Sequence, residues 1–175
     1  MKKNSLLWAL IPCALFTWSC DDDDDAGRDR MQNQEFVTLA SSSNRFEIEA
    51  GDLAGEQGAD ERVIEYGNHM VMDHGAAGTE LAMLAASKGW NVPDELQENH
   101  QQMLEELMAL EGAAFDQEFA TQMVLSHEEA VALFERAAGP DGVLDKELRE
   151  WASEKLPTLR AHLQEAQELN EQINP

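Results

Sequence analysis

The stretch DERVIEYGNHMVMDHGAAGTELAMLAASKG, residues 60–89, decides the fold. Its apolar and small side chains recur at alternating steps of four and three residues, which is the spacing of one buried helix face. The aspartate at its start and the Lys-Gly sequence at its end are typical helix boundaries. The stretch therefore predicts a long amphipathic helix whose inward positions are Val63, Gly67, Met70, His74, Ala77, Leu81 and Leu84.

A related pattern returns farther along the chain. MVMDH at 70–74 reappears as MVLSH at 123–127, an offset of 53 residues (127 − 74). An aromatic residue, a small residue, Met-Val and a histidine superpose at this offset. Two related helical hairpins would produce such a repeat. The second inward face consists of Ala120, Met123, His127, Ala130 and Phe134.

The rest of the chain beyond about residue 33 also has a helical pattern. Ala, Leu, Glu, Gln and Met dominate, and proline is scarce. We expect Pro157 to kink or restart the last helix, and a crossover helix to carry the chain back along the bundle. The sequence thus predicts an all-α, ferritin-like four-helix bundle with a short crossover helix. The predicted helices cover about 34–56, 60–88, 94–110, 114–138 and the segment from the turn at 139–142 to about 172.

The first nineteen residues have the features of an export signal. Lys2 and Lys3 precede an apolar run, residues 6–16, that is too short to span a bilayer. Cys20 follows this run, with the small residue Ser19 directly before it. This arrangement resembles the lipobox of bacterial lipoproteins, which implies that Cys20 is acylated and becomes the mature N-terminus. A plain signal peptide is the alternative.

Cleavage before Cys20 would give a signal peptide at 1–19, an acidic tether at 20–34 and a domain at 35–172. The five aspartates after Cys20 repel one another and stay solvated. They resemble the acidic stretch that sends some bacterial lipoproteins to the cell surface. We therefore expect a lipid-anchored envelope protein, at the outer membrane (periplasmic or surface-exposed) rather than the inner membrane. Its domain would contain no cysteine, since Cys13 leaves with the signal.

The charge balance limits the partners. The chain has 35 acidic and 12 basic residues, a formal net charge of −23. Such a surface argues against nucleic acid and attracts cations. The membrane, through the lipid, is the expected partner, and the sequence identifies no protein partner. The sequence contains no nucleophile elbow, phosphate loop or Cys/His zinc spacing, so we do not expect an enzyme.

Six short stretches together resemble one bacterial envelope family, known as domain of unknown function 4142. They occur in order over nearly the whole predicted mature chain, from about residue 35 to 172. The resemblance implies a ferritin-like bundle, secreted or lipid-anchored, and supplies no activity. The stretches are FEIEAGDLA (46–54), MVMDH (70–74), ELAMLA (80–85), GAAFDQEF (112–119), MVLSH (123–127) and KLPTLRAHL (155–163).

The inward-facing histidines are the candidate site. His74 and His127 lie at similar heights in parallel helices, and Glu47 lies in a small-residue face of the first helix. The sequence favours a structural network in which the histidines bond to Glu47 or to each other and hold the helices in register. The alternative is that these three residues are ligands of a transition metal ion, which is copper, zinc or iron. Met70 and Met123, one turn earlier, would join them if the ion is copper.

His162 also faces inward, but we expect it to lie outside this site. Counting residues from the turn at 139–142 places it about eight residues, or about 12 Å, from the height of His127. We expect His162 and Asp116 to form a structural polar pair instead. His69 and His100 fall off the inward faces, and we expect both to be solvated.

Two functions remain open at this point. One is a non-enzymatic scaffold or stress-associated binding module that acts through the acidic surface. The other is a periplasmic or surface metal-binding protein. The di-iron chemistry of ferritins is not expected, because Val71, Val124 and Leu159 stand where the glutamates would be, three residues before each histidine.

Overall fold

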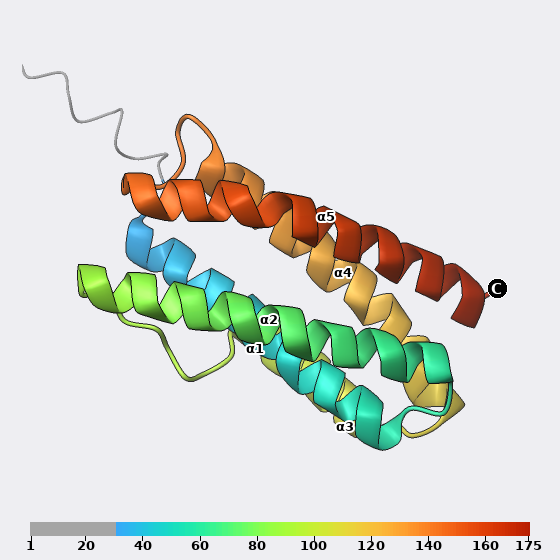
Figure 1. The fold of residues 1–175 in the computed structure, drawn as a ribbon. Helices are drawn as coiled ribbons and strands as arrows, with labels where there is room; N and C mark the ends of the chain where they lie inside the picture. The colour runs from blue at the N-terminus through green and yellow to red at the C-terminus, as the bar shows by residue number, and fades with distance from the viewer. Residues whose placement is uncertain (1–30) are drawn as a thin grey trace, which may run out of the picture.

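The computed structural model describes residues 31–175, which fold into a helical bundle (Figure 1). α1 and α2 form one antiparallel hairpin, and α4 and α5 form the other. Within residues 31–175 no helix is long and apolar enough to cross a membrane. The predicted all-α, ferritin-like fold is confirmed. The helices are α1 (Asn33–Gln57), α2 (Glu61–Lys88), α3 (Glu98–Met108), α4 (Ala113–Ala138) and α5 (Lys146–Ile173).

The predicted signal peptide at 1–19 and the lipidation site Cys20 lie outside the described residues, as does most of the acidic tether at 20–34. The predicted bundle at 35–172 lies within them. α5 continues through Pro157 without a break, so the last helix does not restart there.

α1 and α2 approach each other closely at a pair of glycines. A Cβ atom added to Gly51 would lie 2.5 Å from the carbonyl oxygen of Gly67. One added to Gly67 would lie 2.9 Å from the carbonyl oxygen of Gly51. Real side chains do not fit at such distances, so only glycine allows this spacing of the two backbones. The two helices can therefore bury their inward faces in a common core.

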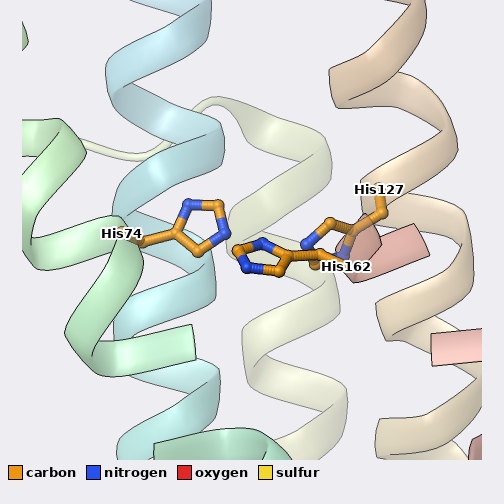
Figure 2. Close-up of side chains that lie close together, drawn as sticks. All are labelled: His74, His127 and His162. Atoms are coloured by element: carbon orange, nitrogen blue, oxygen red, sulfur yellow. The ribbon is translucent and has the colours of Figure 1, made fainter. Parts of the chain in front are cut away.

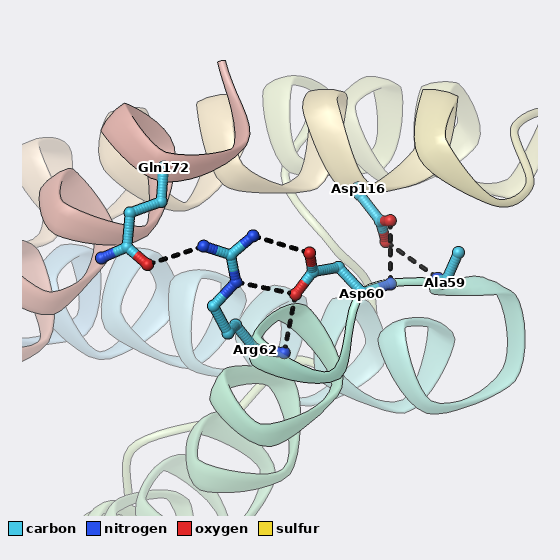
Figure 3. A network of polar contacts seen from close by, with 5 residues as sticks. All are labelled: Ala59, Asp60, Arg62, Asp116 and Gln172. Atoms are coloured by element: carbon cyan, nitrogen blue, oxygen red, sulfur yellow. Dashed lines mark hydrogen bonds and ion pairs between the residues drawn. The ribbon is translucent and has the colours of Figure 1, made fainter. Parts of the chain in front are cut away.

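Polar contacts hold together the end of the bundle where α1 turns into α2 (Figure 3). Asp60 caps α2 by accepting a hydrogen bond from the backbone N–H of Arg62 at 2.9 Å. The Arg62 guanidinium bonds to the Asp60 carboxylate and donates to Gln172 on α5 at 2.8 Å. Asp116 on α4 accepts hydrogen bonds from the backbone N–H groups of Ala59 and Asp60, both at 3.0 Å. Three helices are thus joined at this turn.

The crossover between the two hairpins differs from the prediction. A helix was expected at 94–110, whereas α3 begins four residues later and the chain before it is not helical. Side chains of α1 bond to the backbone there instead. Gln34 both donates to the carbonyl of Asn91 (2.7 Å) and accepts from its N–H (2.9 Å). Ser42 accepts from the N–H of Gln97 at 2.7 Å. The bond from Gln97 lies in the segment that was expected to be helical, and it satisfies a backbone N–H there without a further helical turn.

The core consists of two apolar clusters along the bundle. One surrounds Phe36 and Phe134, and the other surrounds Phe46 and Phe119. In the sequences of α2, α4 and α5, a buried histidine lies between the residues of the two clusters. The middle of the bundle is therefore polar, with apolar packing on both sides.

Candidate metal centre

Three histidines from three helices meet in the middle of the bundle. His74 on α2, His127 on α4 and His162 on α5 are 5 %, 0 % and 3 % exposed. Their ring centroids lie 5.4 to 5.6 Å apart. One ring nitrogen of each lies within 4.8 Å of the others, and Figure 2 shows the rings converging. We call these residues the tri-histidine site.

Each ring is held by a hydrogen bond through one of its nitrogens. The partner is in each case an oxygen that can only accept: a backbone carbonyl, a side-chain amide oxygen or a carboxylate. The imidazole nitrogen therefore carries the proton. The bonds run from Nδ1 of His127 to the carbonyl of Met123 (2.9 Å), from Nδ1 of His74 to Oδ1 of Asn44 (3.1 Å) and from Nε2 of His162 to Oδ2 of Asp73 (3.1 Å).

The other nitrogen of each ring has no partner. Nε2 of His74, Nε2 of His127 and Nδ1 of His162 are buried without a hydrogen bond to any of the described residues. Because the opposite nitrogen carries the proton, each of these atoms is an acceptor with a free lone pair. Buried polar atoms are nearly always paired. Three unpaired acceptors in one place indicate a position for a ligand.

Burial keeps these imidazoles neutral at physiological pH. It lowers the pKa of His127 to about 4. It lowers the pKa of His74 well below the ordinary value, and the neighbouring His127 and His162 lower it further. The pKa of His162 is lowered by burial and by His127. Neutral imidazole is the form that binds transition metal ions.

His162 belongs to this site, contrary to the prediction from residue counting. The count started the last helix at the turn at 139–142, whereas the connection extends to residue 145 and its Val143 folds back into the core. Measured from the facing helix ends, His127 lies 11 residues before the end of α4 (138 − 127), and His162 lies 16 residues after the start of α5 (162 − 146). The difference of five residues is about 7.5 Å of rise. Two imidazole side chains on packed helices can span that distance.

The predicted pair of Asp116 and His162 is wrong. Asp116 lies in the first turn of α4, and its carboxylate accepts the two backbone N–H groups of the α1–α2 turn (Figure 3). His162 lies in the middle of the bundle, where its partner is Asp73 on α2. Asp116 and His162 therefore lie at different heights along the bundle.

Glu47 lies beside His127, but not among the free nitrogens. Its Oε1 is 3.5 Å from Nδ1 of His127, which is the protonated nitrogen, and it accepts a hydrogen bond from Ser126. Burial raises the pKa of Glu47 to about 8 against the opposing effect of this hydrogen bond, so the carboxyl is protonated at neutral pH. The predicted ligands Glu47, His74 and His127 are thus brought together only in part. His162, not Glu47, is the third candidate ligand beside His74 and His127.

Met70 and Met123, the predicted additional ligands for copper, are fully buried in the apolar cluster around Phe46 and Phe119. Each lies one helical turn before a histidine of the tri-histidine site. Their part in copper binding stays a prediction.

A cavity of about 210 Å³ lies beside the histidines. Asp73, His74 and His162 line it, together with mainly apolar side chains of all four long helices. A small molecule such as water has room next to the tri-histidine site, and Asp73, whose side chain is 41 % exposed, lies in the wall of this cavity.

The comparisons with known proteins agree with this architecture. The family model "Domain of unknown function (DUF4142)" matches residues 21–169. The chain belongs to the DUF4142 family. The family resemblance of the six sequence stretches is thereby confirmed, and the DUF4142 match contains α1 to α4 and most of α5.

Among solved structures, this DUF4142 chain is similar to one described as "CopM in the Cu(II)-bound form". The TM-score is 0.65 at 15 % sequence identity, and the similarity covers 82 % of this chain and 98 % of the other. At this identity the similarity shows a shared helical-bundle fold. No curated protein matches this DUF4142 chain in sequence.

Proposed function

We propose that this DUF4142 domain binds one transition metal ion through Nε2 of His74, Nε2 of His127 and Nδ1 of His162. The observation that carries the proposal is the meeting of these three unpaired, buried lone pairs. Imidazole nitrogens bound at about 2.0–2.1 Å in a tetrahedral site lie about 3.4 Å apart. One ring nitrogen of each of the three histidines lies within 4.8 Å of the others, so the rings have to move closer together by at most about 1.4 Å (4.8 − 3.4).

A single water molecule does not satisfy this arrangement, because water has two protons to donate while the site presents three acceptors. The remaining lone pair either takes a second water molecule from the adjacent cavity or stays unpaired, at a cost of about 1–3 kcal/mol. The rings also cannot bond to one another through these atoms, since all three protons lie on the outer nitrogens. A cation satisfies all three lone pairs at once, which favours metal binding over the structural network and the scaffold.

The hydrogen bonds behind the rings support the same reading. Imidazoles that bind metal usually donate their second N–H to a carbonyl or carboxylate, which fixes the ring and makes it a better ligand. Met123 and Asp73 supply such acceptors, and Asn44 supplies an amide oxygen. The net charge of −23 raises the local concentration of cations around the domain.

Copper is the ion we propose first. Nitrogen ligands bind Cu²⁺ more tightly than Zn²⁺ or Fe²⁺. The similar fold of CopM has been solved with Cu(II), which is consistent with this choice. Zinc is the competing ion, because three imidazoles and an open fourth position are also typical of zinc sites.

Equilibrium dialysis of the tag-free protein against Cu²⁺ and Zn²⁺ tests the proposal. We expect one ion per chain in the native protein, and an affinity lowered by more than about tenfold in His127→Gln, since even the loss of an outer-shell partner costs that much. His100→Gln is the matched control, because His100 was expected to be solvated but is buried, and it bonds to Ser42 outside the site. Equal affinities of the native protein and His127→Gln would refute the proposed site.

We also propose that a lipid on Cys20 anchors the domain in the cell envelope, at the outer membrane. The support is the sequence alone: a basic start, a short apolar run and a cysteine at its end. Replacing Cys20 by Ala should release the protein from the membrane fraction. Mass spectrometry of the N-terminus should find an acylated Cys20 in the native protein. An unmodified Cys20, or cleavage elsewhere, would refute the anchor.

A further inference from the structure

A second group of potential ligands lies on the outer side of His162. Oδ2 of Asp73 is 3.1 Å from Nε2 of His162 and 3.3 Å from Nε2 of His69. The three side chains offer ligand atoms within 4.8 Å of one another. The side chains of His69 and Asp73 are 40 % and 41 % exposed, while that of His162 is 3 % exposed. This group, which we call the outer group, therefore connects solvent with the tri-histidine site.

Glu165 on α5 orients His69 within the outer group. Its Oε2 lies 3.4 Å from Nδ1 of His69, so His69 lies between two carboxylates. A neutral imidazole has one proton to donate. With this proton directed at Glu165, the lone pair of Nε2 faces the carboxylate of Asp73, a contact that either a proton or a metal ion on Nε2 makes favourable. A carboxylate behind the second nitrogen is the usual support of a metal-binding histidine.

We infer that His69, Asp73 and His162 form a loading site, which captures the metal ion from solvent and passes it to the tri-histidine site. This inference rests on the proposed function. His162 takes part in both sites through opposite nitrogens, Nε2 toward the loading site and Nδ1 toward the tri-histidine site. Asp73 and His162 also line the cavity that reaches His74, so the ion has a path along the cavity wall.

Because the loading site and the tri-histidine site share the ring of His162, only one of them can hold an ion at a time. A neutral imidazole has one proton and one free lone pair, so His162 can bind an ion through only one nitrogen at a time. While the ion is on Nε2, the proton is on Nδ1. When the ion moves to Nδ1, the proton returns to Nε2 and bonds to Asp73 again. The two sites together therefore hold one ion per chain.

The rate of metal uptake separates a loading site from an ordinary surface ion pair. Stopped-flow mixing of the protein with Cu²⁺, followed by quenching of tryptophan fluorescence, gives this rate. In His69→Ala we expect uptake and release both to be slower by about tenfold, while the equilibrium affinity, their ratio, changes by less than about threefold. Asn68→Ala is the matched control, because Asn68 is the exposed neighbour of His69 on α2. Glu165→Gln should give a smaller effect than His69→Ala.

The outcomes are distinguishable. Slow uptake with unchanged affinity and one ion per chain supports the loading site. Unchanged uptake in His69→Ala overturns it and leaves the proposed function standing. Two ions in the native protein and one in His69→Ala also overturn it, since they would show an independent surface site. If the native protein binds no ion, the proposed function fails and the loading site fails with it.

Discussion

Nδ1 of His127 donates to the carbonyl oxygen of Met123, one turn earlier in the same helix, at 2.9 Å. This bond keeps the proton on Nδ1 and leaves Nε2 as a bare acceptor inside the bundle. His74 and His162 are held in the same way by partners on other helices. The hydrogen bonds made by the protonated nitrogens therefore determine that the opposite nitrogens direct three lone pairs, and no proton, into the middle of the site.

Asn44 offers a direct test of this role of the outer partners. Asn44→Ala removes the acceptor of His74 Nδ1 and should lower metal affinity by about 10- to 100-fold. Asn44→Asp keeps an acceptor at the same place and should retain most of the affinity. Equilibrium dialysis of both variants measures the difference. Equal losses in the two would show that the hydrogen bond to His74 does not matter.

The pH dependence of metal affinity should reflect the burial of the ligands. Protonation competes with the ion, and the pKa of His127 lies at about 4 while those of His74 and His162 are also lowered. Affinity should therefore stay nearly constant as the pH falls from about 7.5 through about 6.5, the ordinary pKa of histidine, and decrease only below it. Calorimetric titrations at several pH values measure this. A loss centred at about 6.5 or higher would indicate exposed histidines instead.

Glu47 should make the protein less stable as the pH rises. Its pKa is raised from 4.5 to about 8 by burial, so between these values the native state holds a proton that the unfolded state has lost. The favourable contribution is complete below pH 4.5 and is lost as the pH rises to about 8. Relative to Glu47→Gln, which keeps the shape but does not titrate, the native protein should lose a few kcal/mol over this range.

Urea unfolding of the native protein and Glu47→Gln at pH 4.5 and pH 8 measures this difference. His127, which lies beside Glu47, is mainly neutral over this range because its pKa is about 4, so the contributions of the histidines cancel. A difference in the free energy of unfolding that does not change with pH would contradict a protonated, buried Glu47.

The glycine pair between α1 and α2 should not tolerate a methyl group. In Gly51→Ala the added Cβ would meet the Gly67 carbonyl at 2.5 Å, so we expect a loss of about 1–3 kcal/mol in the free energy of unfolding. Gly75→Ala is the matched control on α2, since nothing lies within 4 Å of its Cβ position. It should instead stabilise the protein by about 0.5–1 kcal/mol. Equal effects in urea unfolding would contradict the close approach.

The helices were predictable because their signals are local. Asp60 caps α2 as expected, and the apolar residues repeat with helical spacing. Asp145 caps α5, but this start was missed, because the last helix was expected to begin at the turn at 139–142. The non-helical start of the crossover was not predictable in this way. It depends on Gln34 and Ser42, which are far from it in the sequence and bond to its backbone.

The candidate site was predictable only in part. The inward position of His162 could be read from helical spacing, but its height depends on the length of the connection between α4 and α5. That length was underestimated because Val143, an apolar residue, packs into the core from the loop. The part played by Asp73 and Asn44 could not be seen, since partners from separate helices are brought together only by packing.

X-ray absorption spectroscopy of the Cu²⁺-loaded protein tests the central claim most directly. The spectrum of the native protein should show three imidazole nitrogens at about 2.0–2.1 Å, and that of His162→Gln should show two. His162→Gln keeps Asn44, His74 and His127 in place, so the comparison tests specifically whether the ring of His162 binds the ion. A first shell of carboxylate oxygens, or one that is the same in both proteins, would contradict the tri-histidine site.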